Sequence, residues 1–314
     1  MTRVACIGEC MIELREAKGG LYARGYGGDT LNTAIYLARL GTEVDYITAL
    51  GDDPISDQMI ADWASEGVGT ERVARLPGKL PGLYMIQTDG SGERRFFHWR
   101  ENSAARSLMD LAATPDILKS LAGYEVIYFS AITLSIYGED GRARLIAALQ
   151  QARQQGARVA FDTNFRARGW PDLDMARAAY VRAFEVADIV LASTEDLLPL
   201  YPEESPEKLM ARIVNSEAVL KLSEPKSIVR FDGRLHDIKA DPITGNVVDT
   251  TAAGDSFAAA YIAARLVGSD PVEASRAGHR LAGVVVGHPG AIIPRAAMPA
   301  RPPSTQSSSR KGSS

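Results

Sequence analysis

Cysteine is scarce in this sequence, and positive charge is not in excess. Its 314 residues include two cysteines, Cys6 and Cys10, whose spacing matches neither a Cys-x-x-Cys redox pair nor a zinc site. The formal net charge of -4 at pH 7 provides no basic surface for nucleic acid. We therefore expect two buried, reduced thiols in a cytoplasmic protein, and no nucleic-acid partner.

Long apolar runs and two familiar nucleotide-binding loops are also absent. The sequence has no run of about 18 or more apolar residues, so no segment is expected to span a membrane. Residues 1–8 are typical of a buried strand rather than of a signal peptide. There is no Gly-x-x-x-x-Gly-Lys-Ser/Thr loop, and Ile7-Gly-Glu-Cys10 follows the first strand where a dinucleotide-binding oxidoreductase has Gly-x-Gly-x-x-Gly. Both absences argue against Walker-type and Rossmann-type nucleotide binding.

Apolar strand patterns and amphipathic helix patterns alternate along most of the chain. The strands are expected at 3–7, 44–50, 126–130, 158–162, 189–192, 218–221 and 227–230. The helices are expected at 29–41, 55–66, 141–155, 174–187, 207–214, 253–267 and 271–286. This alternation predicts an α/β fold whose central, mostly parallel sheet carries helices on both faces. Ligands of such sheets bind beyond the carboxyl ends of the strands.

Two β-rich segments interrupt this alternation. Residues 83–88 and 94–99 flank the Gly-containing turn Asp89-Gly-Ser-Gly92, which indicates a hairpin. We expect a small β-strand lid, inserted at about 9–25 and 83–100, on a single domain that spans residues 1–300. Residues 301–314 are rich in Pro and Ser and are expected to form a disordered tail.

The strongest chemical signal lies near the C-terminus. An Asp-Thr-Thr turn beginning at Asp249 leads into Ala252, Ala253, Gly254 and Asp255, and then into an Ala-rich helix. The small side chains leave backbone N–H groups uncovered at the helix N-terminus, which favours binding of a phosphoryl group. Asp255, in the first helical turn, is placed to accept the proton of a substrate hydroxyl, and simple helix capping is the alternative.

Two motifs carry a resemblance to a known family. Asp249-Thr-x-Ala-Ala-Gly-Asp255 resembles the C-terminal signature of the ribokinase-like (PfkB) carbohydrate kinases. Gly27-Gly-Asp-Thr-Leu-Asn32 is similar to their N-terminal signature, although Thr30 stands where the family usually has Gly, Ala or Pro. The resemblance covers about residues 3–299 and implies a ribokinase-like fold with ATP and Mg²⁺ as cofactors.

Further segments are similar to the branch of this family that phosphorylates 2-keto-3-deoxygluconate. They are Gly8–Leu14, Gly27–Thr33, Leu80–Tyr84, Gly92–Arg94, Trp99–Arg100 and Gly290–Pro294. The similarity implies ATP-dependent phosphorylation of the 6-hydroxyl, which gives 2-keto-3-deoxy-6-phosphogluconate. A fructokinase or another kinase of a related sugar or keto acid is the alternative, and a non-catalytic sugar-binding relative is a third hypothesis.

Recognition of a sugar acid requires cations, because the substrate carries a carboxylate. Arg100 and Arg166 are the two candidates, since a guanidinium pairs bidentately with a carboxylate or a phosphate. For Arg100, a solvated charge at a strand end is the alternative. The resemblance places Tyr84 and Arg100 on the lid over the substrate, and Arg166 near the sugar and the transferred phosphate.

The remaining sugar contacts are expected at the N-terminal motif and on the lid. Asp29 and Asn32 are expected to bind hydroxyl groups, and Gly28 allows close approach of the backbone. His98 stands where relatives commonly have a tyrosine, two residues before the lid arginine. It can donate a hydrogen bond to a keto or hydroxyl oxygen, or it is a surface residue of the hairpin.

The resemblance also implies which residues contact the nucleotide. The expected contacts are Lys221, Ser193, Thr251, Gly254 and His279. Ser193-Thr-Glu-Asp196 occupies the place of a motif that holds Mg²⁺ through water, and either Glu195 or Asp196 is expected to do so. His279 and Gly287–Ala291 are expected to line either the adenine end of the nucleotide or a loop that binds a monovalent cation such as K⁺.

The expected partners are therefore a sugar acid and ATP. Lids of this family often pair between subunits, and exposed hairpin strands favour such pairing. We expect a homodimer or a higher homo-oligomer through the lid, and no membrane partner.

Overall fold

The structure is a computed structural model that describes residues 3–88, 94–215, 217–243 and 245–299. The predicted turn at 89–92 and the predicted tail at 301–314 lie outside the described residues.

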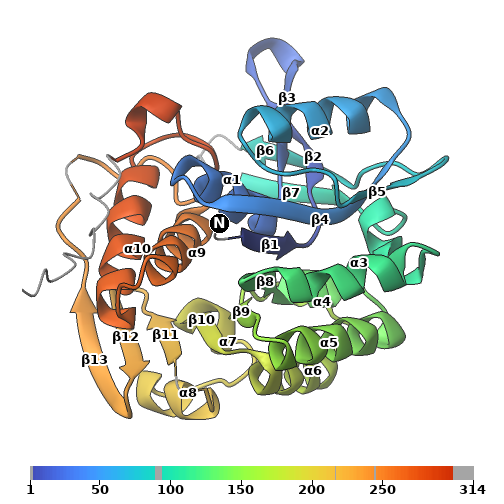
Figure 1. Cartoon of the computed structure of the whole chain (residues 1–314). Helices are drawn as coiled ribbons and strands as arrows, with labels where there is room; N and C mark the ends of the chain where they lie inside the picture. The colour runs from blue at the N-terminus through green and yellow to red at the C-terminus, as the bar shows by residue number, and fades with distance from the viewer. Residues whose placement is uncertain (1–2, 89–93, 216, 244, 300–314) are drawn as a thin grey trace, which may run out of the picture.

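A nine-stranded sheet runs through the centre of the molecule in the order β13-β12-β11-β10-β9-β8-β1-β4-β5 (Figure 1). Its strands are β1 (Arg3–Ile7), β4 (Glu43–Gly51), β5 (Val73–Leu76), β8 (Val126–Ser130), β9 (Arg158–Asp162), β10 (Ile189–Ser193), β11 (Glu217–Lys221), β12 (Lys226–Phe231) and β13 (Arg234–Lys239). All neighbours pair in parallel except β11 with β12 and β12 with β13, which are antiparallel. The predicted mostly parallel sheet is confirmed.

Strand β1 lies inside the sheet because its side chains are apolar on both faces. Val4 and Cys6 belong to one hydrophobic core, whereas the alternate residues Ala5 and Ile7 belong to the other. A strand buried on both sides is typically a continuous apolar run, and this pattern allowed its bounds to be predicted. The chain leaves β1 toward β4 and later returns to β8 on its other side, so the strand order reverses at β1. Ligands of open parallel sheets bind at such a reversal.

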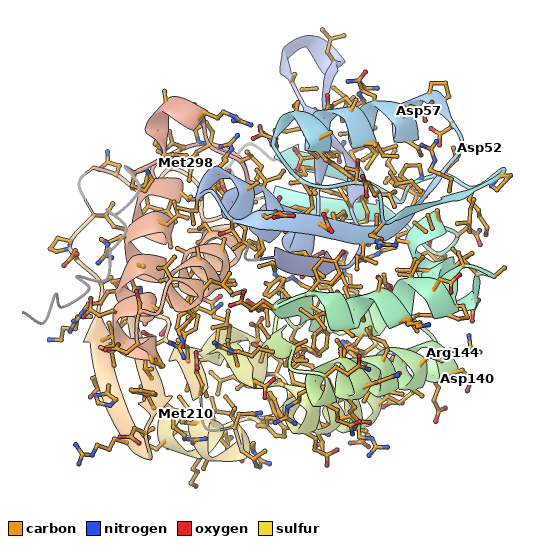
Figure 2. All side chains as sticks on the ribbon, in the orientation of Figure 1. Asp52, Asp57, Asp140, Arg144, Met210 and Met298 are labelled. Carbon is orange, nitrogen blue, oxygen red and sulfur yellow. The ribbon has the colours of Figure 1, made fainter. Side chains whose placement is uncertain are left out.

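Helices cover both faces of the sheet, as expected (Figure 1). One core contains residues of α1 (Asp29–Arg39), α2 (Pro54–Ser65), α9 (Ala253–Leu266) and α10 (Pro271–Val285). The other contains residues of α3 (Thr114–Ser120), α4 (Ala131–Ile136), α5 (Glu139–Gln154), α6 (Leu173–Val186), α7 (Thr194–Leu197) and α8 (Pro206–Arg212). Charged side chains such as Asp140 and Arg144 point outward from α5 (Figure 2).

A second, smaller sheet has the order β3-β2-β6-β7. Its strands are β2 (Met11–Glu16), β3 (Tyr22–Gly27), β6 (Leu83–Thr88) and β7 (Arg94–Trp99). Only β3 extends beyond the predicted insertion limits, ending at Gly27 instead of at residue 25. We call these four strands the small sheet. An α/β fold with a smaller separate sheet is thus confirmed.

Five elements were not predicted, namely α3, α4, α7, β5 and β13. Helix α4 has only six residues, and its alternating sequence Ala-Ile-Thr-Leu-Ser-Ile resembles a strand. It is helical because Ser130 caps it, accepting a hydrogen bond from the backbone N–H of Thr133. Strand β13 is polar and mostly exposed, so its sequence has no apolar periodicity from which a strand could be predicted.

No helix in the described ranges is both long enough and apolar enough to cross a bilayer.

The aromatic cluster between β9 and α6 supports a stability prediction. Phe184 is 3% exposed, and its ring centroid lies 5.9 Å from that of Phe161 and 6.0 Å from that of Tyr180. Phe184→Ala should lower the free energy of unfolding by about 3–5 kcal/mol through lost burial and a residual cavity. The control is Val181→Ala, also on α6. It should lower the free energy of unfolding by about 0.5 kcal/mol or less, because Val181 is 50% exposed. Equal urea midpoints for the two variants would contradict this packing.

Candidate active site

Polar side chains from six segments meet beyond the carboxyl ends of the strands. They come from the residues after β1, β9 and β10, from the end of β11, and from the N-termini of α1 and α9. Gly28 precedes α1 and allows two segments to meet, since a Cβ on it would lie 2.2 Å from the backbone oxygen of Glu9. Its φ of -175° is ordinary extended backbone, so crowding is what requires glycine there. The crowding at Gly28 is with the chain itself, and its predicted approach to the sugar stays a prediction.

The N-terminus of α9 is open toward this region. Ala252 precedes the helix with a φ of 60°, in the left-handed region, and no side chain of the described residues caps the helix. Asp249 holds the preceding turn, accepting hydrogen bonds from the N–H and Oγ1 of Thr251 at 3.0 and 2.6 Å. Its other oxygen accepts the N–H of Gly290 at 2.9 Å. This turn leaves the small residues Ala253 and Gly254 at the start of the helix, where backbone N–H groups favour an anion.

Asp255 occupies the first turn of α9, and its carboxylate is bound across the site. Asn32 Nδ2 donates to Asp255 Oδ2 at 2.8 Å. Burial raises the pKa of Asp255 well above the ordinary carboxyl range, and the charge of Asp29 raises it further. The hydrogen bond from Asn32 and the charge of Lys221 oppose this shift. A carboxylate of raised pKa is a stronger proton acceptor, as a general base requires.

Asp29 and Thr33, at the start of α1, make further contacts around Asp255. Asn164 Nδ2 donates to Asp29 Oδ2 at 2.9 Å. Thr33 Oγ1 lies 3.3 Å from the backbone oxygen of Asp255 and 3.1 Å from that of Asp29. Asp29, Asn32 and Asp255 are therefore brought together, as the sequence motifs suggested.

Lys221 lies beside the N-terminus of α9. Its Nζ is 3.6 Å from Asp162 Oδ2. A Cβ on Gly254 would be 3.5 Å from the same Nζ, an ordinary contact distance, so the ammonium group lies next to the start of α9. Burial raises the pKa of Asp162, and the charge of Lys221 opposes that rise. A cation and uncovered helix N–H groups thus face the same space, which favours a phosphate there.

The small sheet supplies the other predicted contacts. Tyr84 donates its hydroxyl to Glu13 Oε2 at 2.5 Å, and its ring stacks on His98 with centroids 5.9 Å apart. Burial lowers the pKa of His98, and the charges of Arg100 and Arg168 lower it further, so a neutral imidazole is favoured at pH 7. Arg100 forms an ion pair with Glu9.

The loop after β9 meets α7 at Asp196. The buried carboxylate of Asp196 accepts hydrogen bonds from Thr163 Oγ1, the Phe165 N–H and Ser193 Oγ at 2.9, 3.0 and 2.7 Å. Arg166 lies 3.5 Å from it, with a side chain that is 61% exposed. Asp196 and Ser193 are thus occupied in holding the loop and capping α7.

Glu195 and Asp196 are the two carboxylates predicted to hold Mg²⁺ through water. Glu195 is exposed on α7, whereas Asp196 is occupied by the hydrogen bonds described above. Among the described residues, no group of three or more His, Cys, Asp or Glu could hold a metal ion. The assignment of Mg²⁺ to either carboxylate remains a prediction.

His279 packs behind the site. Its ring contacts that of Phe257 edge-on at 5.1 Å, and its Nε2 lies 3.0 Å from Ser227 Oγ. Burial, with the charge of Lys221, lowers the pKa of His279 to about 4. These contacts join α10 to α9 and β12. The predicted nucleotide contacts of His279 and of the exposed Thr251 remain predictions.

Several residues of the site were not singled out from the sequence. They are Glu9, Glu13, Asp162 and Asn164, which hold Arg100, Tyr84, Lys221 and Asp29 respectively. Glu9 and Glu13 lie inside the recognised segment Gly8–Leu14, and Asp162 is the last residue of a predicted strand. Their partners are distant in the chain, however, so periodicity and spacing could not reveal the pairings.

Comparison with known proteins agrees with this geometry. Residues 1–298 match the protein family described as pfkB family carbohydrate kinase. The 2-dehydro-3-deoxygluconokinase of Escherichia coli K12 is 40% identical over 307 residues, covering 95% of this chain and 99% of that protein. The 2-dehydro-3-deoxygluconokinase of Dickeya dadantii is 42% identical over 306 residues, covering 95% and 98%.

A solved structure is similar in fold. It is the aminoimidazole riboside kinase of Salmonella enterica, complexed with aminoimidazole riboside and an ATP analog. It has a TM-score of 0.81 and 22% identity, and covers 96% of this chain and 97% of that one. The chain belongs to the pfkB family of carbohydrate kinases, and the expected ribokinase-like fold is confirmed.

The charges around Asp255 support a pH prediction. A general base must be deprotonated, so kcat/KM should fall as the pH drops through its pKa. Asp29→Asn removes a negative charge that raises this pKa, so the acidic limb should move to lower pH. Lys221→Met removes a positive charge that lowers it, so the limb should move to higher pH. Profiles of kcat/KM against pH for the two variants and the unmodified enzyme provide the measurement. Movement in the same direction would contradict the assignment.

Proposed function

We propose that this chain transfers the γ-phosphoryl group of ATP to the 6-hydroxyl of 2-keto-3-deoxygluconate, giving 2-keto-3-deoxy-6-phosphogluconate. The observation that carries the chemistry is Asp255, a carboxylate of raised pKa held by Asn32 at the open N-terminus of α9. The sugar is supported by curated relatives named 2-dehydro-3-deoxygluconokinase, at 40% and 42% identity over 95% of the chain.

Asp255 acts as the general base. Its carboxylate takes the proton of the attacking hydroxyl while the oxygen bonds to phosphorus and ADP leaves. The backbone N–H groups at Ala252, Ala253 and Gly254 stabilise the charge on the transferred oxygens. The exposed guanidinium of Arg166, on the loop after β9, adds a positive charge on that side of the site. These groups need little reorganisation, because the turn at Asp249 already holds the helix start in place.

ATP lies on the side of Lys221 in this proposal. Lys221 faces the N-terminus of α9, where the γ-phosphate would arrive. When bound, Mg²⁺ neutralises charge on the phosphates, and Glu195 is the carboxylate that would hold it through water. Ser193, Thr251 and His279 are the remaining proposed nucleotide contacts, and a monovalent cation near Gly287–Ala291 is proposed on the resemblance alone.

The small sheet acts as a lid whose side chains bind and recognise the sugar acid. Arg100 would pair with the substrate carboxylate, and Tyr84 and neutral His98 would contact keto or hydroxyl oxygens. Arg168 donates to the backbone oxygen of Phe96 at 3.2 Å, which connects the small sheet to the loop after β9. With a neutral sugar, the N–H donors of Arg100 that do not bind Glu9 would face no substrate carboxylate, and this disfavours the fructokinase alternative.

We also propose that the lid pairs with a second copy of the chain. Phe97 and Trp99, on the face of β7 opposite His98, are 42% and 54% exposed. Exposed apolar side chains on an edge strand favour such pairing. A cytoplasmic location is supported by Cys6 and Cys10, which are both free and buried.

Replacement of the base tests the mechanism. Asp255→Asn keeps the size of the side chain but removes the proton acceptor, so kcat should fall by about 10²–10⁴-fold with little change in KM for ATP. Steady-state kinetics and a thermal melt of the same preparation provide the measurements. Near-normal turnover by the folded variant would eliminate Asp255 as the base.

Arg100→Ala tests the substrate class. The variant should raise KM for 2-keto-3-deoxygluconate by about 10-fold or more, because a charge-assisted pair is lost. It should leave the weak turnover of neutral sugars such as fructose unchanged. The control is Arg95→Ala, an exposed arginine of β7, the strand that Arg100 directly follows. A coupled ATPase assay over a panel of sugars and sugar acids gives the result. Equal loss on both classes would refute the carboxylate role, and preference of the unmodified enzyme for fructose would refute the proposed substrate.

A further inference from the structure

Arg100 is held from behind by a buried glutamate. Glu9 lies two residues after β1 and is 2% exposed, while Arg100 directly follows β7. Arg100 Nη2 donates to Glu9 Oε2. The glutamate side chain is 1% exposed and the arginine side chain 20%, so solvent reaches only the arginine. The pair therefore joins the central sheet to the small sheet, with the cation on the accessible side.

Hydrogen bonding around this pair is incomplete. Within the described ranges, Glu9 Oε1 and Arg100 Nε are buried without a hydrogen-bond partner. Ser103, whose N–H donates to the backbone oxygen of Arg100, also has a buried Oγ without a partner. Buried polar atoms are nearly always paired, and a buried ion pair seldom stabilises a fold more than an apolar contact would. A contribution to fold stability alone does not account for a buried Glu–Arg pair that keeps an unpaired acceptor and an unpaired donor.

The backbone leaves space for this pair at one glycine. A Cβ on Gly82 would lie 2.9 Å from Glu9 Oε1 and 3.2 Å from Arg100 Cβ. Gly82 comes directly before β6, and its oxygen accepts the N–H of Ile12 at 2.8 Å. The starts of β2 and β6 and the end of β7 thus lie together at one end of the small sheet, where Glu9 meets Arg100.

We infer that Glu9 is a positioning residue that fixes the guanidinium of Arg100 for the substrate carboxylate. This inference rests on the proposed function. One terminal nitrogen of the guanidinium is committed to Glu9, and the remaining N–H donors are left for the ligand. A guanidinium held in one orientation loses less freedom when it pairs with a carboxylate, so its ligand binds more tightly. Glu9 itself does not contact the sugar.

A double-mutant cycle tests this role. Glu9→Ala and Glu9→Gln are made in the unmodified enzyme and in Arg100→Ala. KM for 2-keto-3-deoxygluconate, KM for ATP and kcat are measured for each. Glu101→Gln is the control, because it removes the same charge from an exposed neighbour of Arg100. A thermal melt of each protein checks folding. If Glu9→Ala does not fold, Glu9→Gln carries the test, since it retains the volume and one acceptor oxygen.

Glu9→Ala should raise KM for the sugar acid by about 10–100-fold, with a much smaller change in kcat and in KM for ATP. The KM of Glu9→Gln should lie between those of the unmodified enzyme and Glu9→Ala, because the amide oxygen of Gln can still accept a hydrogen bond from Arg100. In Arg100→Ala, the Glu9 substitutions should add little, since Glu9 acts through that arginine.

Two results would overturn the inference. One is an unchanged KM in folded Glu9→Gln and Glu9→Ala. The other is an equal rise in KM with and without Arg100, which would mean that Glu9 acts by another route. Both are distinct from failure of the proposed function, which would appear as no turnover of 2-keto-3-deoxygluconate by the unmodified enzyme.

Discussion

The hydrogen bond from Asn32 to Asp255 is the contact on which the site depends. It joins two residues 223 positions apart and connects the first turns of α1 and α9. Thr33 reinforces the same junction through the backbone oxygen of Asp255. Because both helices pack in one core, their N-termini are held rigidly at the reversal of the sheet. The proposed base, the proposed sugar contacts of α1 and the N–H groups proposed to bind phosphate are thereby placed within one region.

Charge at this junction is arranged at some cost to the fold. Asp29, Asp162 and Asp196 are all buried near one another, and the first two raise the pKa of Asp255. The positive charge of Lys221 offsets part of the repulsion between these carboxylates. Hydrogen bonds from side-chain amides and hydroxyls stabilise them further. Burial of several carboxylates is unfavourable unless they are paired, so their concentration at the carboxyl ends of the strands indicates function. The same charges that disfavour ionisation make Asp255 a better base.

Glutamates give the small sheet its polar organisation. Glu13 binds Tyr84 and Glu9 binds Arg100, so both proposed sugar contacts are held by carboxylates from the segment after β1. That segment leads directly from the centre of the large sheet into β2. Movement of the small sheet and orientation of its contacts are therefore physically linked. This is the property that a lid closing over a substrate requires.

The sequence by itself determined the α/β class, the bounds of strands such as β1, β8 and β9, and the hairpin of β6 and β7, because apolar periodicity is a local property. It also located Asp255, since a run of small residues before an Ala-rich helix is a local pattern. Short capped helices such as α4 and the polar edge strand β13 were missed, because neither has a distinctive apolar period. Only the tertiary structure decided the pairings of Asn32 with Asp255, of Asn164 with Asp29 and of Glu9 with Arg100. Each depends on where the sheet order reverses and on which helices share a face, and no spacing along the chain encodes that.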